Sequence, residues 1–359
     1  MRGRPGMTPN TVPPVTLAAT ATAVPPFRIG RDEVKTYLQR VFSLDASRLE
    51  AMLAIVDHSQ VKQRYCAHPI ETIIAPRPLD QINREYADHA VRLGATVVEA
   101  CLKRAGMTAA QVDLFITVSC TGVMIPSLDA HLANRFTFRS DVRRLPITEL
   151  GCAAGAAALG YAADHVRAYP EATVLIVAVE LPSLTFQRFD TSQANLISSI
   201  LFGDGAAAAI VTGQGAARGP RIARHESFLF PDSLGAMGFE LQASGFHIVL
   251  SRDVPELIRR EVRGLVDGVG RVHRASRRAE APDLHRGGAR PDAGGHGVLL
   301  ARAARVWQPV ERLGAVRPAR VAHATHAARG RPPPGGLHGA PGRVRPGIQR
   351  QPGPAALVN

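Results

Sequence analysis

A single cysteine, Cys152, stands where the sequence most readily suggests covalent chemistry. It lies in ITELGCAAGAAALGYAADHVRAY (147–169), between a short apolar run and an alanine-rich segment with helical spacing that ends at Pro170. The unpaired N–H groups and the dipole of a helix N-terminus favour a thiolate, the nucleophilic form of a thiol. Gly151 permits a tight turn, and the small residues after Cys152 leave room for a substrate carbonyl. From spacing alone, a small buried apolar thiol is an equally open interpretation.

The other cysteines are Cys66, Cys101 and Cys120, and no two of the four have CxxC or His/Cys ligand spacing. This pattern argues against a disulfide framework and a zinc site, and it suits a reducing cytoplasm. The GDGA motif at 203–206 lacks the lysine of a phosphate-binding loop. The sequence therefore favours thiol chemistry that uses no metal.

Residues 27–268 are predicted to form the α/β body that positions this cysteine. Strands alternate with helices, which predicts a largely buried sheet with helices on both faces. The predicted strands are DLFITVSC (113–120), ATVLIVAVEL (172–181) and GDGAAAAIVTG (203–213), with RRLPITEL (143–150) extended; the predicted helices are 28–42, 47–60, 82–106, closed by Gly106, and 127–136.

The two ends of the chain differ from this body. Residues 1–26 are rich in Pro, Thr and Ala and are predicted to be a flexible leader rather than a signal peptide. No apolar run approaches the ~20 residues of a membrane span. Residues 269–359 are dense in Arg, Ala, Gly, Pro and His, and they are predicted to be irregular or disordered.

The net charge of +13 belongs almost entirely to this tail. After Gly270 there are sixteen arginines, no lysine and four acidic residues, a local charge of +12 that leaves +1 for the first 270 residues. The body therefore does not resemble a basic nucleic-acid-binding protein.

Five motifs, in order and with family-like spacing, resemble the type III polyketide synthases, the chalcone synthase-like branch of the thiolase-fold condensing enzymes. The resemblance covers roughly residues 30–268 and implies a layered αβαβα fold. The motifs are VSCTGVMIPSLDAHLANRF (118–136), ITELGCAAGAAALGYA (147–162), VELPSLTFQRFD (179–190), SSILFGDGAAAAIV (198–211) and ASGFHIVLSRDVPELI (243–258).

The resemblance implies an acyltransferase chemistry. A starter acyl group moves from coenzyme A to Cys152, and malonyl-CoA is decarboxylated to an enolate that attacks the thioester, giving pyrone-, resorcinol- or chalcone-like products. Phe186 and Phe246 match two phenylalanines that shape and shield the pocket, and Cys120 matches a pocket-lining position. The resemblance also implies a homodimer, in which GVMIP (122–126) reaches the partner's cavity. Coenzyme A thioesters are substrates there, and no further cofactor is expected.

The second half of that family's active site is missing from the sequence. Family members carry a histidine in an HPGGP-like turn and an asparagine in a YGNxSSAS-like turn, and both donate hydrogen bonds to the reacting oxygens. His285, in LHRGGARP, is the candidate nearest the expected position, but its surroundings differ. Asn359 is the only asparagine after Val269.

A shift of reading frame near Asp267–Arg271 is one explanation of the tail. Back-translation of RVWQPVERLGAV (305–316), read one nucleotide later, can give Gly-Tyr-Gly-Asn-Leu-Ser-Ser-Ala-Ser-Val. The same shift of GIQRQPGPAALVN (347–359) can give an apolar terminal strand and a stop. We therefore expect the chain as printed to be inactive or poorly folded.

Two alternatives stay open. A ketoacyl synthase III or HMG-CoA synthase relative would share the fold and the cysteine, although TFQ, CTGVMIPS and SGFH favour the polyketide branch. A nucleic-acid binder would use the arginine-rich tail for salt-sensitive binding, but Trp307 alone offers a stacking ring there, so no nucleic-acid partner and no membrane are expected.

Overall fold

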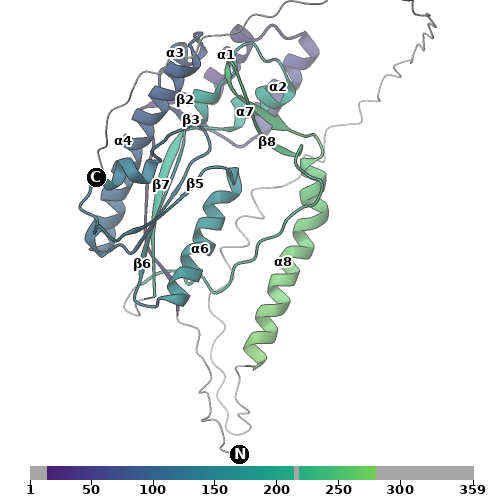
Figure 1. Ribbon diagram of the computed structural model, residues 1–359. Coiled ribbons are helices and arrows are strands. Elements are labelled where there is room, and N and C mark those ends of the chain that lie inside the picture. Colours follow the sequence, from purple (N-terminus) through teal and green to yellow (C-terminus); the bar gives the residue numbers. More distant parts are fainter. Residues whose placement is uncertain (1–13, 214–217, 280–359) are drawn as a thin grey trace, which may run out of the picture. The chain divides into compact units, whose positions relative to one another are not determined.

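The core of the protein is a five-stranded mixed sheet (Figure 1). The computed structural model describes residues 14–213 and 218–279, with side chains up to residue 267. The strand order is β1-β7-β6-β4-β5; β4 runs parallel to β5 and β6, whereas β7 is antiparallel to β6 and β1. The strands are β1 (Thr16–Ala23), β4 (Leu114–Val118), β5 (Arg143–Ile147), β6 (Thr173–Glu180) and β7 (Gly205–Thr212).

Helices cover both faces of this sheet, as the sequence predicts. Along β6 the side chains alternate: Leu175 and Val177 join the core beneath α4 (Leu79–Ala105), while Val174 and Ile176 join the core beneath α6 (Ala154–Ala168). Figure 1 shows α4 and α6 on opposite sides of the sheet. A strand covered on both faces requires the continuous apolar run that the sequence contains there.

Other predicted elements are confirmed with adjusted bounds. Helix α4 ends where Gly106 adopts the left-handed conformation, φ 66°, which costs glycine little. The helix expected at 127–136 is shorter, α5 (Leu128–Ala133), and the helix expected from residue 28 begins three residues later, because Phe27–Gly30 forms strand β2. The other elements are α1 (Arg31–Val41), α2 (Ala46–His58), β3 (Gln63–Cys66), α3 (Ile70–Ile74), α7 (Gln193–Leu201), β8 (Met237–Gln242), β9 (Gly245–Leu250) and the 3₁₀ turns η1 (Ala109–Gln111), η2 (Gly151–Ala153) and η3 (Pro182–Thr185).

The flexible leader predicted over residues 1–26 is wrong for its second half. Residues Thr16–Ala23 form β1, an edge strand paired with β7 from Thr16↔Thr212 to Ala23↔Ala206. Strand β7 is rich in alanine, and the small Thr and Ala side chains of β1 therefore fit beside its small side chains in the paired ladder. Composition alone does not predict such a strand, because the strand is stabilised by ladder hydrogen bonds and by packing against α4. Residues 1–13 lie outside the described part.

The boundary predicted at residue 268 is also wrong. Helix α8 runs from Val254 to Ala279 without a break, and thus through the first eleven residues of the predicted irregular tail. Arginine and alanine are good helix formers, so the change in composition near Val269 does not by itself end a helix. The rest of the tail lies outside the described residues.

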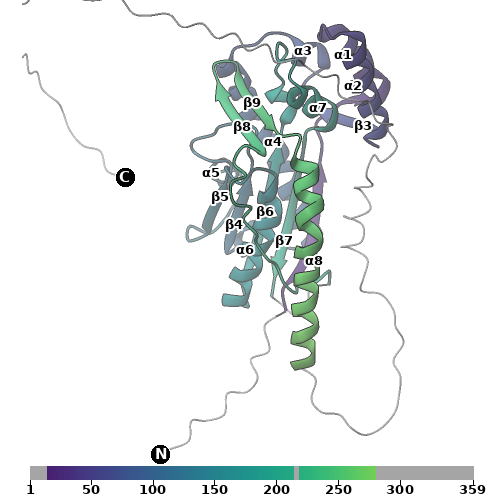
Figure 2. The same cartoon turned by 90° about the vertical axis from the view of Figure 1, so that its right-hand side faces the viewer.

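A third apolar cluster joins α1, α2, α7 and the β2–β3 ladder. Figure 2 shows α1, α2 and α7 close together in the upper part of the view. The buried members of the cluster include Leu38, Val56, Cys66 and Leu196. Within the described residues, no helix is long and apolar enough to cross a membrane.

Candidate active site

Cys152 lies at the junction between strand β5 and helix α6. The chain leaves β5 at Ile147 and turns at Gly151, whose φ of 53° strongly favours glycine. It then forms η2, which contains Cys152 and leads directly into α6. No side chain caps η2 or α6, and the N–H groups of Ala153 and Ala154 donate to the carbonyls of Leu150 and Gly151. The N–H groups that precede them at the start of η2 are therefore the ones that can face a negative charge.

The thiol of Cys152 is accessible, whereas Cys66 and Cys101 are buried. A methyl group built on Gly155, one turn further along α6, meets no atom within 4 Å. The surface beside the thiol is therefore open, as the small residues after Cys152 predict. The interpretation of Cys152 as a buried apolar thiol is thereby wrong.

The parallel strands bring a second thiol to the same edge of the sheet. Val118 of β4 pairs with Ile147 of β5 and with Ala178 of β6, so β4 and β5 end level with each other and β6 continues to Glu180 at the same edge. Cys120 follows β4 there and interacts electrostatically with Cys152. Burial, and next the Glu180 carboxylate, raise the pKa of Cys120 to about 12, so this thiol stays protonated at neutral pH.

Glu180 is the residue of this group that the sequence analysis missed. Its carboxylate accepts hydrogen bonds from the backbone N–H of Cys120, at 3.1 and 3.2 Å, and from the hydroxyl of Thr121, at 2.7 Å. Burial raises the pKa of Glu180. The available signal was an acidic residue at the end of an otherwise apolar strand, since such a group needs polar partners when buried.

The two predicted pocket phenylalanines belong to two sequence motifs that are hydrogen-bonded to each other. Gln187, next to Phe186, donates hydrogen bonds to the carbonyls of Ser244 and Phe246, both at 3.3 Å. Phe186 packs edge-on against Phe42 (5.8 Å between ring centroids), and Phe246 packs likewise against Phe239 (5.8 Å). The TFQ and SGFH motifs are therefore neighbours, joined by a glutamine that sequence reasoning did not single out.

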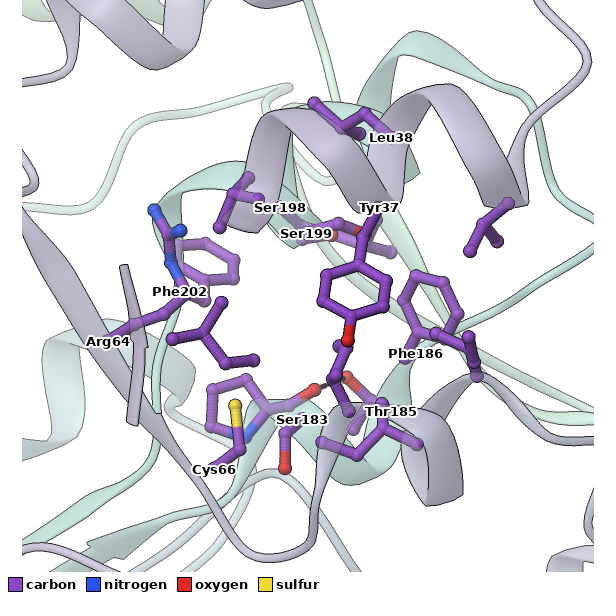
Figure 3. Close-up of a pocket in the computed structure, with 18 of the residues that line it drawn as sticks. Tyr37, Leu38, Arg64, Cys66, Ser183, Thr185, Phe186, Ser198, Ser199 and Phe202 are labelled. Carbon is purple, nitrogen blue, oxygen red and sulfur yellow. Dashed lines mark hydrogen bonds between the residues drawn. The ribbon is translucent and has the colours of Figure 1, made fainter. Parts of the chain in front are cut away.

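Phe186 lines an apolar cavity of about 80 Å³ (Figure 3). Cys152, Cys120 and Phe246 are not among the residues that line it. The structure therefore brings Cys120 to Cys152, and Phe186 close to the SGFH hairpin, but it does not unite these two groups in one cavity.

A polar hollow lies between the β8–β9 hairpin and the segment after η3. Ser244 and His247 face each other there, with 2.7 Å between Oγ and Nε2, and Asp190 lies 3.7 Å from Nδ1 of His247. The Asp190–His247 contact is longer than a hydrogen bond.

The remaining predicted site residue, His285, lies outside the described residues. Within the described part, no group of three or more His, Cys, Asp or Glu side chains could hold a metal ion. The GDGA motif serves the fold: the Asp204 carboxylate accepts hydrogen bonds from the N–H groups of Ala67 (2.6 Å) and Ser183 (2.8 Å).

Helices on both faces of a mixed sheet, with an accessible cysteine between a strand end and a helix start, fit the class that the comparisons show, the condensing enzymes of the thiolase fold. Residues 8–215 match the family model described as chalcone and stilbene synthases, N-terminal domain. The chain is 38% identical to the 1,3,6,8-tetrahydroxynaphthalene synthase of Streptomyces peucetius over 69% of this chain and 67% of that protein. It is 32% identical to a putative chalcone synthase of Bacillus subtilis over 67% of this chain and 70% of that protein.

A solved structure agrees with these relatives. The crystal structure of 1,3,6,8-tetrahydroxynaphthalene synthase from Streptomyces coelicolor, a bacterial type III polyketide synthase, superposes with a TM-score of 0.68 at 36% identity, covering 71% of this chain and 73% of that one. The chain therefore belongs to the chalcone and stilbene synthase family, the type III polyketide synthases, which are acyltransferases. It spans about two thirds of the length of the curated relatives that it matches, from 64% to 70%.

Proposed function

We propose that Cys152 carries the growing acyl chain of a decarboxylative condensation. The Cys152 thiolate attacks the carbonyl of an acyl-CoA, a C–S bond forms and the coenzyme A thiolate leaves. Malonyl-CoA loses CO₂, the electron pair of the broken C–C bond becomes an enolate, and this carbon attacks the Cys152 thioester. A new C–C bond forms and the Cys152 thiolate is released. Coenzyme A thioesters are the substrates, and no further cofactor takes part.

The observation that carries this proposal is the accessible thiol of Cys152 at the start of an uncapped helical segment, just after a glycine turn. The start of a helix in general favours a negative charge, and an acyl transfer to sulfur requires a thiolate. Cys120, held protonated beside it, adds a neutral thiol rather than a competing nucleophile.

The aromatic groups supply the apolar surroundings of the reaction. In this proposal Phe186 and Phe246 shield the enolate from water, since a dry environment strengthens electrostatic interactions with the reacting oxygens. The name of the Streptomyces relative favours a cyclised aromatic product.

We further propose that the chain as printed is inactive, and that the frame-restored chain is a cytoplasmic homodimer. The printed sequence has no counterpart of the HPGGP or YGNxSSAS turns, and loss of each hydrogen-bond donor costs on the order of 10²–10³ in rate. Ile125, in the GVMIP segment, is 92% exposed, as suits a residue that reaches a second copy.

The test compares the printed chain, the frame-restored chain and the restored chain with Cys152→Ala. We expect malonyl-CoA-dependent pyrone or resorcinol formation from the restored chain alone. Intact mass spectrometry should show the starter acyl group on the restored chain and not on Cys152→Ala, with Cys101→Ala as the matched control that keeps both readouts. Product from the printed chain would overturn the proposed inactivity; acylation of Cys152→Ala would overturn the proposed nucleophile. Acetyl transfer without use of malonyl-CoA would favour a ketoacyl synthase III or HMG-CoA synthase-like activity.

A further inference from the structure

The cavity beside Phe186 is large enough for a small organic molecule. It is bounded by α1, α3, α7, β3, η3 and the β8–β9 hairpin, and its volume is about 80 Å³. One water molecule needs on the order of 10–15 Å³ on this measure, so roughly six groups of that size fit. Most of its lining is aliphatic or aromatic, including Leu38, Ile73 and Phe186.

One charged group, Arg64, interrupts this apolar lining. The residue as a whole is 7% exposed, and the Nε and Nη2 atoms are shielded from solvent without any hydrogen-bond partner. Figure 3 draws Arg64 at one side of the cavity with Phe202 and Cys66, opposite Phe186. Among the described residues that line the cavity, Arg64 alone carries a charge. Burial lowers the pKa of Arg64, yet a guanidinium stays protonated in proteins.

Two carboxylates on neighbouring segments are hydrogen-bonded to other groups. Asp204, which like Arg64 acts electrostatically on Cys66, accepts hydrogen bonds from Ala67 and Ser183. Glu71 accepts one from the hydroxyl of Tyr37. A buried guanidinium without a counter-charge is costly, so an anion that enters the cavity gains strongly from it.

We propose that this cavity binds a short monocarboxylate with an apolar body. The two oxygens of a carboxylate match the fork of the Arg64 guanidinium, and the hydrocarbon lies against Leu38, Ile73 and Phe186. A phosphate is less suited, because its second charge finds no other cation in this lining. The proposal does not depend on the condensation reaction, although a bound acid would contact the ring of Phe186.

The experiment measures binding of hexanoate to the full chain by isothermal titration calorimetry, with hexan-1-ol as the uncharged probe of similar shape. Three variants complete it: Arg64→Met, Arg64→Lys, and Arg28→Met as the matched control. Arg28 lies on the adjacent strand β2, one residue before the partner of Arg64, and its exposed side chain bonds to Gln63.

We expect hexanoate to bind the native chain roughly 10- to 100-fold more tightly than hexan-1-ol. Arg64→Met should remove that preference, Arg64→Lys should keep part of it, and Arg28→Met should change the affinity less than twofold. Thermal unfolding should show hexanoate raising the Tm of the native chain but not of Arg64→Met. Without ligand, the Tm of Arg64→Met should equal or exceed the native value, because the variant removes an unpaired buried charge.

Three results overturn the proposal. One is equal affinity for hexanoate and hexan-1-ol, or no binding of hexanoate. Another is a lower Tm for ligand-free Arg64→Met, which would make the guanidinium a structural group. The third is a native chain without a cooperative unfolding transition, since the cavity would then not exist in solution.

Discussion

Cys152 and Cys66 have the same side chain, but their surroundings make one thiol accessible and the other buried and unreactive. Cys152 lies accessible between a strand end and a helical segment. Cys66 ends strand β3 within the cluster of α1, α2 and α7, is 4% exposed, and interacts with Asp204 and Arg64. Burial, and next the Asp204 charge, raise the pKa of Cys66 to about 12. The residue type is the same, and burial in the fold keeps the thiol of Cys66 protonated and out of contact with solvent, whereas Cys152 is exposed.

The comparison also separates two uses of polar groups. Around Cys152, no side chain caps the helix start, so the N–H groups ahead of Ala153 can act on a substrate. Around Cys66, the Asp204 carboxylate accepts hydrogen bonds from two backbone N–H groups and so holds the fold together. The Arg64 side chain there has two nitrogen atoms without a hydrogen-bond partner. The unpaired groups of each region are therefore where ligands are expected.

Alkylation should separate the two cysteines most strongly. In the folded chain at neutral pH, iodoacetamide should modify Cys152 and leave Cys66 unmodified. Because the pKa of Cys66 is about 12, against a usual value of 9.0, its thiolate fraction alone is reduced on the order of 10³-fold. Peptide mass spectrometry should therefore show the Cys66 rate rise by at least that factor in guanidinium chloride. Similar rates for both cysteines in the folded chain would break the comparison.

Asp204 should make the Cys66 region sensitive to pH. Burial raises the pKa of Asp204 to about 6, from a usual value of 3.8. The folded state therefore holds this proton more tightly, and the contribution to stability is complete below pH ~4 and is lost as the pH rises through ~6. The free energy of unfolding of the native chain, minus that of Asp204→Asn, should fall across this window by about 3 kcal/mol. A difference that stays constant with pH would contradict the prediction.

Substitution of two glycines near Cys152 should give the smallest change in the free energy of unfolding, and each variant is a control for the other. Gly151→Ala should lower the free energy of unfolding by about 1–2 kcal/mol, because φ is 53° although space is open around the residue. Gly155→Ala, equally open but helical, should raise it by roughly 0.5–1 kcal/mol. Denaturant titrations of both variants measure this. A loss of stability in both would show that packing rather than backbone conformation controls the turn.

The sequence was most informative where local pattern and final environment agree. The apolar run of β6, the strand β7 and the glycine that ends α4 were predicted, because a strand buried on both faces and a left-handed helix end each require particular residue types. The family, and Cys152 as the candidate nucleophile, also followed from local motifs. Glu180 and Gln187 were missed, because their partners come from distant segments.

The amino-acid sequence by itself determined the αβ alternation, the family and the turn that presents Cys152, since these depend on residues close together along the chain. Only the tertiary structure decided that Thr16–Ala23 is a strand, that Cys120 interacts with Cys152, and that Arg64 lines an apolar cavity with two nitrogen atoms left without a partner. Strand pairing, electrostatic shifts and burial depend on which distant segments meet. One-dimensional patterns do not contain that information, because the same residue gains or loses free energy according to its neighbours in space.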